Sequence, residues 1–390
     1  MDFPLLEQDM RGEFELRVEK VRRQMRARNA DGLLVASSIN LFYLAGGVYR
    51  GYIYIGLESD PVVFMIPPAE WKGAHSIRKP EQIPAIIGEQ HAPKRLALEF
   101  DDLFYSEIER LAKLWPDAEI VNGSALLRGA RIVKTDKELE MMREDGRRQA
   151  AVYSRIKYCY QEDMTDMEFQ IEIERMLRRE GCLGYLRAAG SRMELNMGSV
   201  ISGANADVPS PYDFSMGGAG ADPSLPVGAS GTTMHPGVTV MVDMNGGFNG
   251  YQTDMTRVWS IGSIPDRAHE CHECSRAILR DLERFSLPGE EIGEMYRRAS
   301  KIASEAGLHE YFMGHRFHVA FIGHGVGIEL NEQPVVMERN KMKLEKGMTI
   351  ALEPKFVLPE IGALGVENTY IVTDKGLENI TVLNEEIQEL

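Results

Sequence analysis

Two aspartates flank a dense cluster of turn residues in the middle of the chain. Asp243 and Asp254 lie in apolar runs within the stretch 240–258, on either side of the turn-forming segment 245–250. This pattern predicts a β-hairpin, and we expect the two side chains to face one another across it, about 5 Å apart. Two carboxylates this close in an apolar hairpin repel one another unless a cation lies between them. The hairpin therefore indicates a divalent metal site, although two unrelated aspartates beside a turn would give the same pattern.

Three further residues could complete the ligand set of a metal ion. His324 lies in the segment 323–327, GHGVG, where glycines let the backbone approach closely and leave one imidazole in a tight space. Glu353 and Glu367 lie in two apolar runs separated by the turn segment 358–362, which predicts a second hairpin with a carboxylate in each arm. Four carboxylates around one divalent ion would leave about two uncompensated charges, whereas two ions balance them and can share a bridging hydroxide.

The order and spacing of these residues resemble the metal-ligand signature of the pita-bread metallopeptidases, which include methionine aminopeptidase, aminopeptidase P and the Xaa-Pro dipeptidases. The signature is an Asp, a ten-residue gap, a second Asp, then GHGxG, then EP, then a Glu in a β-run. The resemblance covers essentially the whole chain, because the segment 40–46, NLFYLAG, is similar to the N-x-x-Y-L-x-G segment of the creatinase-type N-terminal domain. It implies a metal centre with five ligands: Asp243, Asp254, His324, Glu353 and Glu367.

Length and periodicity predict an α/β protein of two domains. The chain has 390 residues, of which 44% are apolar, enough to bury a sizeable core. In its first part we expect strands at about 32–36, 52–57, 61–66 and 95–99, and helices near 14–25, 68–78 and 104–114. The resemblance then implies a creatinase- and prolidase-like N-terminal α/β domain over 1–130 and a pita-bread catalytic domain with pseudo-twofold symmetry over 131–390.

The second domain is expected to contain two pairs of helices, each followed by a carboxylate-bearing hairpin. Capping boxes at Thr135 with Glu138 and at Thr165 with Glu168 predict the starts of the first pair. The second pair is expected at about 265–286 and 290–306.

The helix expected at 265–286 carries closely spaced His and Cys residues. Cys271 belongs to its apolar stripe and Cys274 lies beside it, which favours small core residues over a metal cluster. His269 and His272 are then expected to face outward.

Charge and composition restrict the partners. The net charge of −15 argues against nucleic acid or an anionic membrane. No apolar run is long enough to span a membrane, the acidic segment 1–13 is unlike a signal peptide, and four cysteines fit reduced thiols. We therefore expect a cytoplasmic protein that binds a small molecule or a short peptide. The resemblance of the N-terminal domain to those through which creatinase-like proteins dimerise further implies a homodimer, and Tyr49, Arg50 and Trp71 are residue types that interfaces favour.

Two positions depart from the resemblance. The peptidases carry a His seven residues after the ligand His, where this chain has Asn331, and a His before the first hairpin, where it has Ser210. Neither side chain can take up a proton near neutral pH as imidazole can. His315 and His318 are the nearest replacements in the sequence, and we assign His318 a catalytic role beside Glu353.

Three residues are predicted to bind substrate: Ser210, Asn331 and Arg257. Arg257 resembles the Arg that follows the second Asp in prolidase-like sequences, and it could either orient a carboxylate or form a structural pair. The segment 215–231, rich in Gly, Ala, Pro and Ser, is expected to form a long loop beside the site.

The resemblance implies a dinuclear metallohydrolase that cleaves a C–N bond, with Xaa-Pro dipeptides or short peptides as substrates. Glu353 would both bind metal and shuttle the proton. We expect two divalent ions, Mn²⁺ first and Co²⁺, Fe²⁺ or Zn²⁺ as alternatives, because the ligands are oxygen-rich with one imidazole. The missing histidines leave open a small non-peptide substrate, as in creatinase, ectoine hydrolase and a dimethylsulfoniopropionate lyase. A catalytically silent metal-binding module is the third interpretation, and the intact ligand set makes it the weakest.

Overall fold

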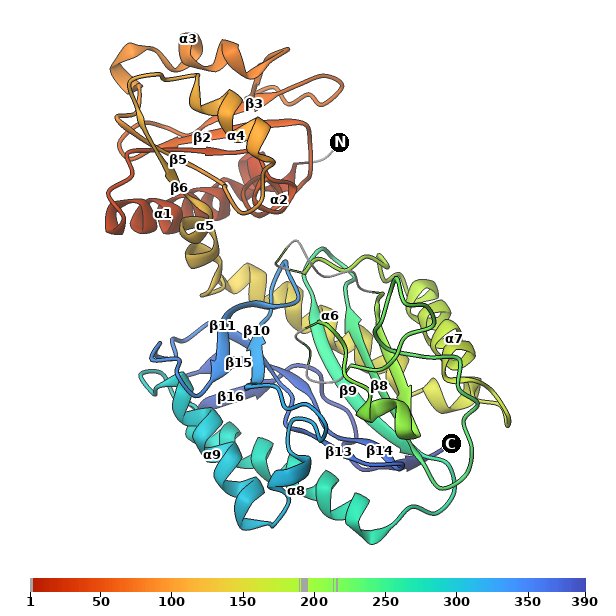
Figure 1. Cartoon of the computed structure of the whole chain (residues 1–390). Coiled ribbons are helices and arrows are strands. Elements are labelled where there is room, and N and C mark those ends of the chain that lie inside the picture. The colour runs from red at the N-terminus through yellow and green to blue at the C-terminus, as the bar shows by residue number, and fades with distance from the viewer. Residues whose placement is uncertain (1–2, 189, 191–195, 213, 215–216) are drawn as a thin grey trace. The chain divides into compact units, whose positions relative to one another are not determined.

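A computed structural model describes residues 3–188, 190, 196–212, 214 and 217–390. The chain divides into two compact units, Met1–Arg131 and Ile132–Leu390, each of which combines helices with β-sheet (Figure 1). The predicted α/β class is therefore confirmed. Among the described residues, no helix combines the length and the apolar character needed to cross a membrane.

The first unit is built on a six-stranded sheet of order β4-β3-β2-β1-β5-β6. Its strands are β1 Gly32–Val35, β2 Gly51–Gly56, β3 Val62–Met65, β4 His75–Ser76, β5 Arg95–Leu98 and β6 Glu119–Asn122. Its helices are α1 Arg11–Ala27, α2 Ser38–Ala45, α3 Ile83–Ile87, α4 Tyr105–Ala112 and α5 Ser124–Arg131. The segment 40–46 has a structural role in this unit, because Asn40 donates to the buried carboxylate of Glu99 at 2.7 Å and Tyr43 donates to the carbonyl of Ala130 at 3.3 Å.

Two expectations for the first unit are wrong. The helix predicted near 68–78 is absent, and turns followed by β4 occupy this segment. Pro68 at its start and Gly73 in its middle both disfavour a helix. Tyr49 is buried within its own chain, where its ring packs edge-on against Phe3 at 5.1 Å, so it is not available to an interface.

The second unit contains a four-stranded sheet of order β17-β9-β8-β7, a five-stranded sheet of order β11-β10-β12-β15-β16, and the pair β13-β14. The strands before its last two helices are β7 Gly198–Ser202, β8 Thr239–Gly246 and β9 Thr253–Ser260. The later strands are β10 Phe321–Gly325, β11 Glu332–Met337, β12 Thr349–Leu352, β13 Lys355–Leu358, β14 Gly362–Gly365, β15 Asn368–Thr373, β16 Gly376–Asn379 and β17 Gln388–Glu389.

Two pairs of helices cover these strands, as expected from the sequence. The first pair is α6 Asp136–Tyr153 and α7 Asp166–Arg179, which lie beside β7, β8 and β9 (Figure 1). Both capping boxes are present. The second pair, α8 Asp266–Phe285 and α9 Ile292–Glu305, shares a core with β10, β13 and β14. Short 3₁₀ helices connect the elements of the chain: Pro4–Leu6, Gln8–Met10, Pro80–Gln82, Glu89–His91, Ile156–Cys159, Gly203–Asp207 and His309–Tyr311.

Three of the four His and Cys residues of α8 are core residues. Cys271 and Cys274 are buried and His269 is exposed, as predicted. The expectation for His272 is wrong: it is also buried, and its Nε2 lies 2.6 Å from the carbonyl oxygen of Glu385 in the C-terminal segment that covers the helix. Burial lowers the pKa of His272 to about 4.

This buried imidazole predicts an acid-sensitive fold. Because the unfolded chain protonates His272 near its ordinary pKa of 6.5 and the folded chain only near 4, the free energy of unfolding falls as the pH drops through this window. We expect the wild type to lose about 3 kcal/mol more than His272→Gln, whose amide can still donate to the Glu385 carbonyl. Urea unfolding at several pH values measures this difference, and parallel pH profiles would contradict it.

Candidate metal centre

The β8-β9 hairpin carries both predicted aspartates on one face. Asp243 pairs with Thr256, and Asp254 pairs with Asn245. The carboxylates are therefore diagonal neighbours, not directly opposed residues as predicted, because the turn spans 247–252 in place of 245–250. Diagonal neighbours lie about 7 Å apart at the backbone, which leaves room for a cation between their side chains.

The two glutamates lie where both arms of the second predicted hairpin are interrupted, Glu353 between β12 and β13 and Glu367 between β14 and β15. Leu352 of β12 pairs with Asn368 of β15, and Lys355 of β13 pairs with Gly365 of β14. The same register on both sides of the interruption places Glu353 opposite Glu367. Both carboxylates are buried, so the interruption directs two charges into the protein interior.

The two hairpins are joined next to these acids. Thr256 and Glu367 form an isolated antiparallel bridge, and the Thr256 hydroxyl donates to Glu367 Oε2 at 2.7 Å. The Thr369 hydroxyl accepts from the amide of Asp254 at 2.8 Å and donates to its carbonyl at 2.9 Å. The acids of different hairpins are therefore fixed relative to one another through their backbones.

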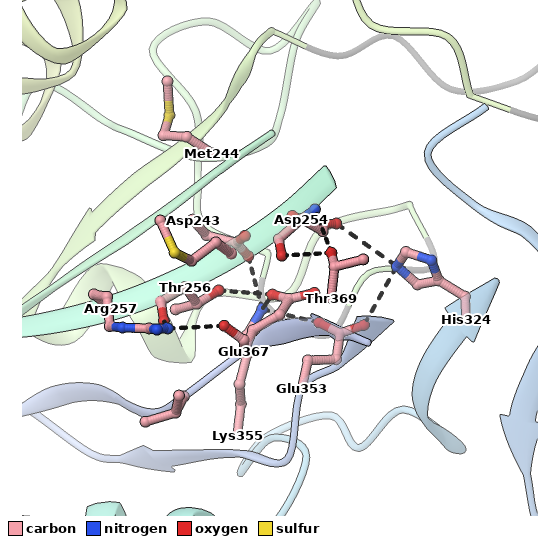
Figure 2. A network of polar contacts seen from close by, with 12 residues as sticks. Asp243, Met244, Asp254, Thr256, Arg257, His324, Glu353, Lys355, Glu367 and Thr369 are labelled. Atoms are coloured by element: carbon pink, nitrogen blue, oxygen red, sulfur yellow. Dashed lines mark hydrogen bonds and ion pairs between the residues drawn. The ribbon is translucent and has the colours of Figure 1, made fainter. Parts of the chain in front are cut away.

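His324 reaches the cluster from β10, the strand beside β12. A side chain at Gly323 would meet the carbonyl oxygen of Ala351 at 2.1 Å, so the neighbouring strand requires glycine there, as expected. The Nδ1 of His324 lies 3.1 Å from the carbonyl oxygen of Gly325, which leaves Nε2 facing the acids. This Nε2 lies 3.8 Å from an oxygen of Asp254 and 3.7 Å from an oxygen of Glu353 (Figure 2).

The ammonium group of Lys355 lies among three of the four carboxylates (Figure 2). Its Nζ donates to Asp243 Oδ2 at 2.7 Å and to Glu353 Oε2 and Glu367 Oε2 at 2.9 Å each. Burial acts to lower the pKa of Lys355, but the three carboxylates outweigh it and raise this pKa well above its ordinary value. Lys355 is therefore a charged group inside the protein.

The surroundings of the acids oppose their ionisation. Burial, followed by the charges of Asp243 and Glu353, raises the pKa of Asp254 well above its ordinary value. Burial and the charge of Asp254 do the same to the pKa of Glu367. Both shifts indicate that a further cation beside these acids would be bound strongly.

A set of ligand atoms for such a cation is present. One atom each from Asp254, His324 and Glu367 lie within 4.8 Å of one another. Oε1 of Glu367 is buried and has no hydrogen-bond partner within the described part of the chain, which is unfavourable unless a cation binds it. Carboxylate oxygens with one imidazole suit a divalent first-row ion, so these residues fit a metal.

A cavity of about 200 Å³ opens onto the cluster. Asp243, Asp254, His324 and Glu353 line it together with Asn331, as predicted for a site residue. Its other walls are largely apolar and include Leu186, Met197, Phe214, Val227, Phe321 and Val335.

The other predicted site residues lie elsewhere. Ser210 lines a separate hollow of about 30 Å³ that also contains His315, and its hydroxyl donates to the carbonyl of Pro226 at 2.9 Å. His318 is exposed, with Nδ1 2.8 Å from the carbonyl oxygen of Phe312, and it does not line the larger cavity. Part of the predicted loop 215–231 also borders the two cavities, but residues 215 and 216 lie outside the described residues.

Arg257 lies behind the cluster, where its guanidinium group donates hydrogen bonds to the segment that carries Glu367. It is buried, and it donates to the carbonyl of Glu367 at 2.9 Å and to the side-chain oxygen of Asn368 at 2.8 Å. These contacts support the structural role of this residue, because they fix the segment that carries Glu367. Burial lowers its pKa from the usual arginine value.

Lys355 is the residue that the sequence analysis missed. A signal was present, because it stands two residues after Glu353 and begins the apolar run Phe356-Val357-Leu358. A lysine in a buried strand requires anionic partners, and alternate strand residues point to the same side. Together these two rules place Lys355 near the carboxylates.

Comparison with known proteins agrees with this geometry. The profile of metallopeptidase family M24 matches residues 140–374, and the profile of the creatinase/prolidase N-terminal domain matches residues 17–133. A protein named Xaa-Pro dipeptidase from Pyrococcus furiosus is 25% identical over 382 residues, covering 95% of this chain and 99% of its own.

Two solved structures share the fold. An Xaa-Pro dipeptidase from Bacillus anthracis superposes with a TM-score of 0.81 at 23% identity, covering 97% of this chain and 100% of its own. The prolidase from Pyrococcus horikoshii has a TM-score of 0.77 at 23% identity, covering 95% of this chain and 99% of its own. The resemblance inferred from the ligand motifs is thereby confirmed.

Asp254→Asn tests the centre as a metal site. Bound Mn²⁺ at a hundred times its Kd should stabilise the wild type by about 2.7 kcal/mol, and this gain should disappear in the variant. Without metal, the variant should be about as stable as the wild type, because burial and the charges of Asp243 and Glu353 already favour the neutral form of Asp254, which the amide resembles. Thermal melts with and without Mn²⁺ measure both effects. The matched control is Asp374→Asn on the exposed surface, and equal gains in all three proteins would contradict the assignment.

Proposed function

The chain belongs to metallopeptidase family M24, and we propose that it is a metal-dependent peptidase that hydrolyses Xaa-Pro dipeptides. The main support is the cluster of acids and one imidazole that opens onto a cavity of about 200 Å³. A cavity of this size can hold a small substrate such as a dipeptide. Relatives matched over nearly the whole chain carry the name Xaa-Pro dipeptidase.

We assign the metal centre to the five residues predicted from the sequence: Asp243, Asp254, His324, Glu353 and Glu367. A divalent ion bound there would supply a Lewis acid and lower the pKa of a water molecule. Mn²⁺ is our candidate, ahead of Co²⁺, Fe²⁺ and Zn²⁺, because the ligands are mostly oxygen atoms.

The residues of the chain would bind, orient and transfer protons. Glu353 lines the cavity, so its carboxylate can accept a proton from the water molecule that attacks the peptide carbonyl and deliver it to the nitrogen of the leaving amine. Asn331 offers an amide that can hydrogen-bond to the substrate from the wall of the same cavity. The apolar walls suit the ring of a proline residue. His318 receives no catalytic role in this proposal, because it does not line the cavity.

A small non-peptide substrate, the alternative suggested by Asn331 and Ser210, is not favoured by the relatives, which are named as dipeptidases. Ser210 lines a second hollow, which shares Phe214 with the larger cavity, so Ser210 does not itself line the space that we assign to the substrate.

We also propose that the protein is a cytoplasmic homodimer, with an N-terminal domain over 1–130 and a catalytic domain over 131–390. The four cysteines are unpaired thiols, which fits a reducing compartment. In the first unit Arg50 is exposed, Trp71 is half-buried, and Phe104 and Tyr105 expose 83% and 73% of their surface, so this unit offers residues suited to an interface.

Asn331→Ala tests the substrate site. We expect Mn²⁺-loaded wild type to cleave Ala-Pro, and the variant to lose about tenfold in kcat/KM, the effect of one hydrogen bond. Ser210→Ala is the matched control and should retain wild-type activity. Steady-state kinetics on Ala-Pro and Ala-Ala measures both. Metal-loaded wild type that cleaves neither dipeptide would overturn the proposed activity.

The proposed dimer is tested by mass. Light scattering at micromolar concentration should give about twice the mass of one chain. A monomeric mass over the whole concentration range would exclude the homodimer.

A further inference from the structure

The ammonium group of Lys355 occupies a position that a metal ion could otherwise take. The residues of the centre form two groups, and within each group the ligand atoms lie within 4.8 Å of one another. The first group is Asp243, Glu353 and Glu367, and the second is Asp254, His324 and Glu367. Lys355 donates to all three members of the first group. The second group shares only Glu367 with the first, so most of its ligand atoms come from other residues.

The backbone of β13 directs the side chain of Lys355 toward the acids. Phe356, the next residue of β13, is buried in the core and packs against Phe312 at a ring distance of 5.3 Å. Strand alternation therefore turns Lys355 to the opposite side, toward the acids. None of its side chain is exposed, and its strand partner is Gly365, which has no side chain to compete for the space.

The contacts of Lys355 are incompatible with a metal ion at the same point. A divalent ion binds carboxylate oxygens at about 2.0–2.2 Å, so it would have to lie among the same three oxygens that the ammonium holds at 2.7 to 2.9 Å. A second cation directly beside a buried ammonium would also be repelled strongly.

We infer that Lys355 replaces one metal ion, so that this centre holds a single divalent ion bound by Asp254, His324 and Glu367 with Glu353 beside them. The buried Oε1 of Glu367 remains available for that ion. Four carboxylates, one ammonium and one divalent ion leave about one negative charge. The expectation of two ions counted the same carboxylates without the lysine.

This inference rests on the proposed metal centre and is tested by stoichiometry. Isothermal titration with Mn²⁺ and elemental analysis should give one ion per wild-type chain. Lys355→Ala frees the three carboxylates of the first group, so the variant, purified in Mn²⁺, should bind two. The control Lys346→Ala removes an exposed lysine and should still bind one.

Electron paramagnetic resonance gives an independent measurement on the wild type, should Lys355→Ala not fold. An isolated Mn²⁺ gives a simple hyperfine pattern, and two neighbouring ions give a coupled spectrum. Two ions per wild-type chain, a coupled wild-type spectrum, or a folded Lys355→Ala protein that binds only one ion would overturn the inference. No uptake by wild type or variant would instead overturn the metal centre itself, and the inference with it.

Discussion

The mutual repulsion of four clustered carboxylates, three of them buried, is the constraint on which this centre depends. Asp254, Glu353 and Glu367 are buried and Asp243 is partly exposed beside them, so the repulsion between their carboxylates is weakly screened. The protein supplies part of the compensation itself through Lys355, whose ammonium binds three of them. A divalent ion next to His324 would supply two further positive charges. The carboxylate charge that Lys355 leaves uncompensated therefore favours the binding of a metal ion.

The scaffold holds the acids in place against this repulsion. Neutral and cationic groups fix the backbone of two of the acids. Thr256 forms a bridge to Glu367, the Thr369 hydroxyl accepts from the amide of Asp254, and the Arg257 guanidinium donates to the Glu367 carbonyl. From the other side the Tyr153 hydroxyl of α6 donates to the β9 backbone at the Met255 carbonyl at 2.6 Å. These contacts pre-organise the ligands, so that binding a metal requires little rearrangement.

The sequence predicted the parts of this protein that follow from local pattern. The capping boxes predicted where α6 and α7 begin. The order of Asp, Asp, His, Glu and Glu predicted the acids and the imidazole that lie together in the structure. What it missed depends on the exact position of a turn and on tertiary contacts. The two-residue register shift at Asp243 depends on the turn, and the burial of His272 depends on a distant C-terminal segment. The role of Lys355 depends on strands brought together from opposite halves of the unit, which no local pattern contains.

One divalent ion and one lysine together offset about three of the four carboxylate charges of this centre. Anomalous diffraction from a crystal of the Mn²⁺-loaded protein tests this most directly, because it locates each ion among named side chains. We expect one anomalous peak among Asp254, His324, Glu353 and Glu367, with Lys355 Nζ still among Asp243, Glu353 and Glu367. Two anomalous peaks, or a peak at the position of Nζ with the lysine displaced, would contradict it.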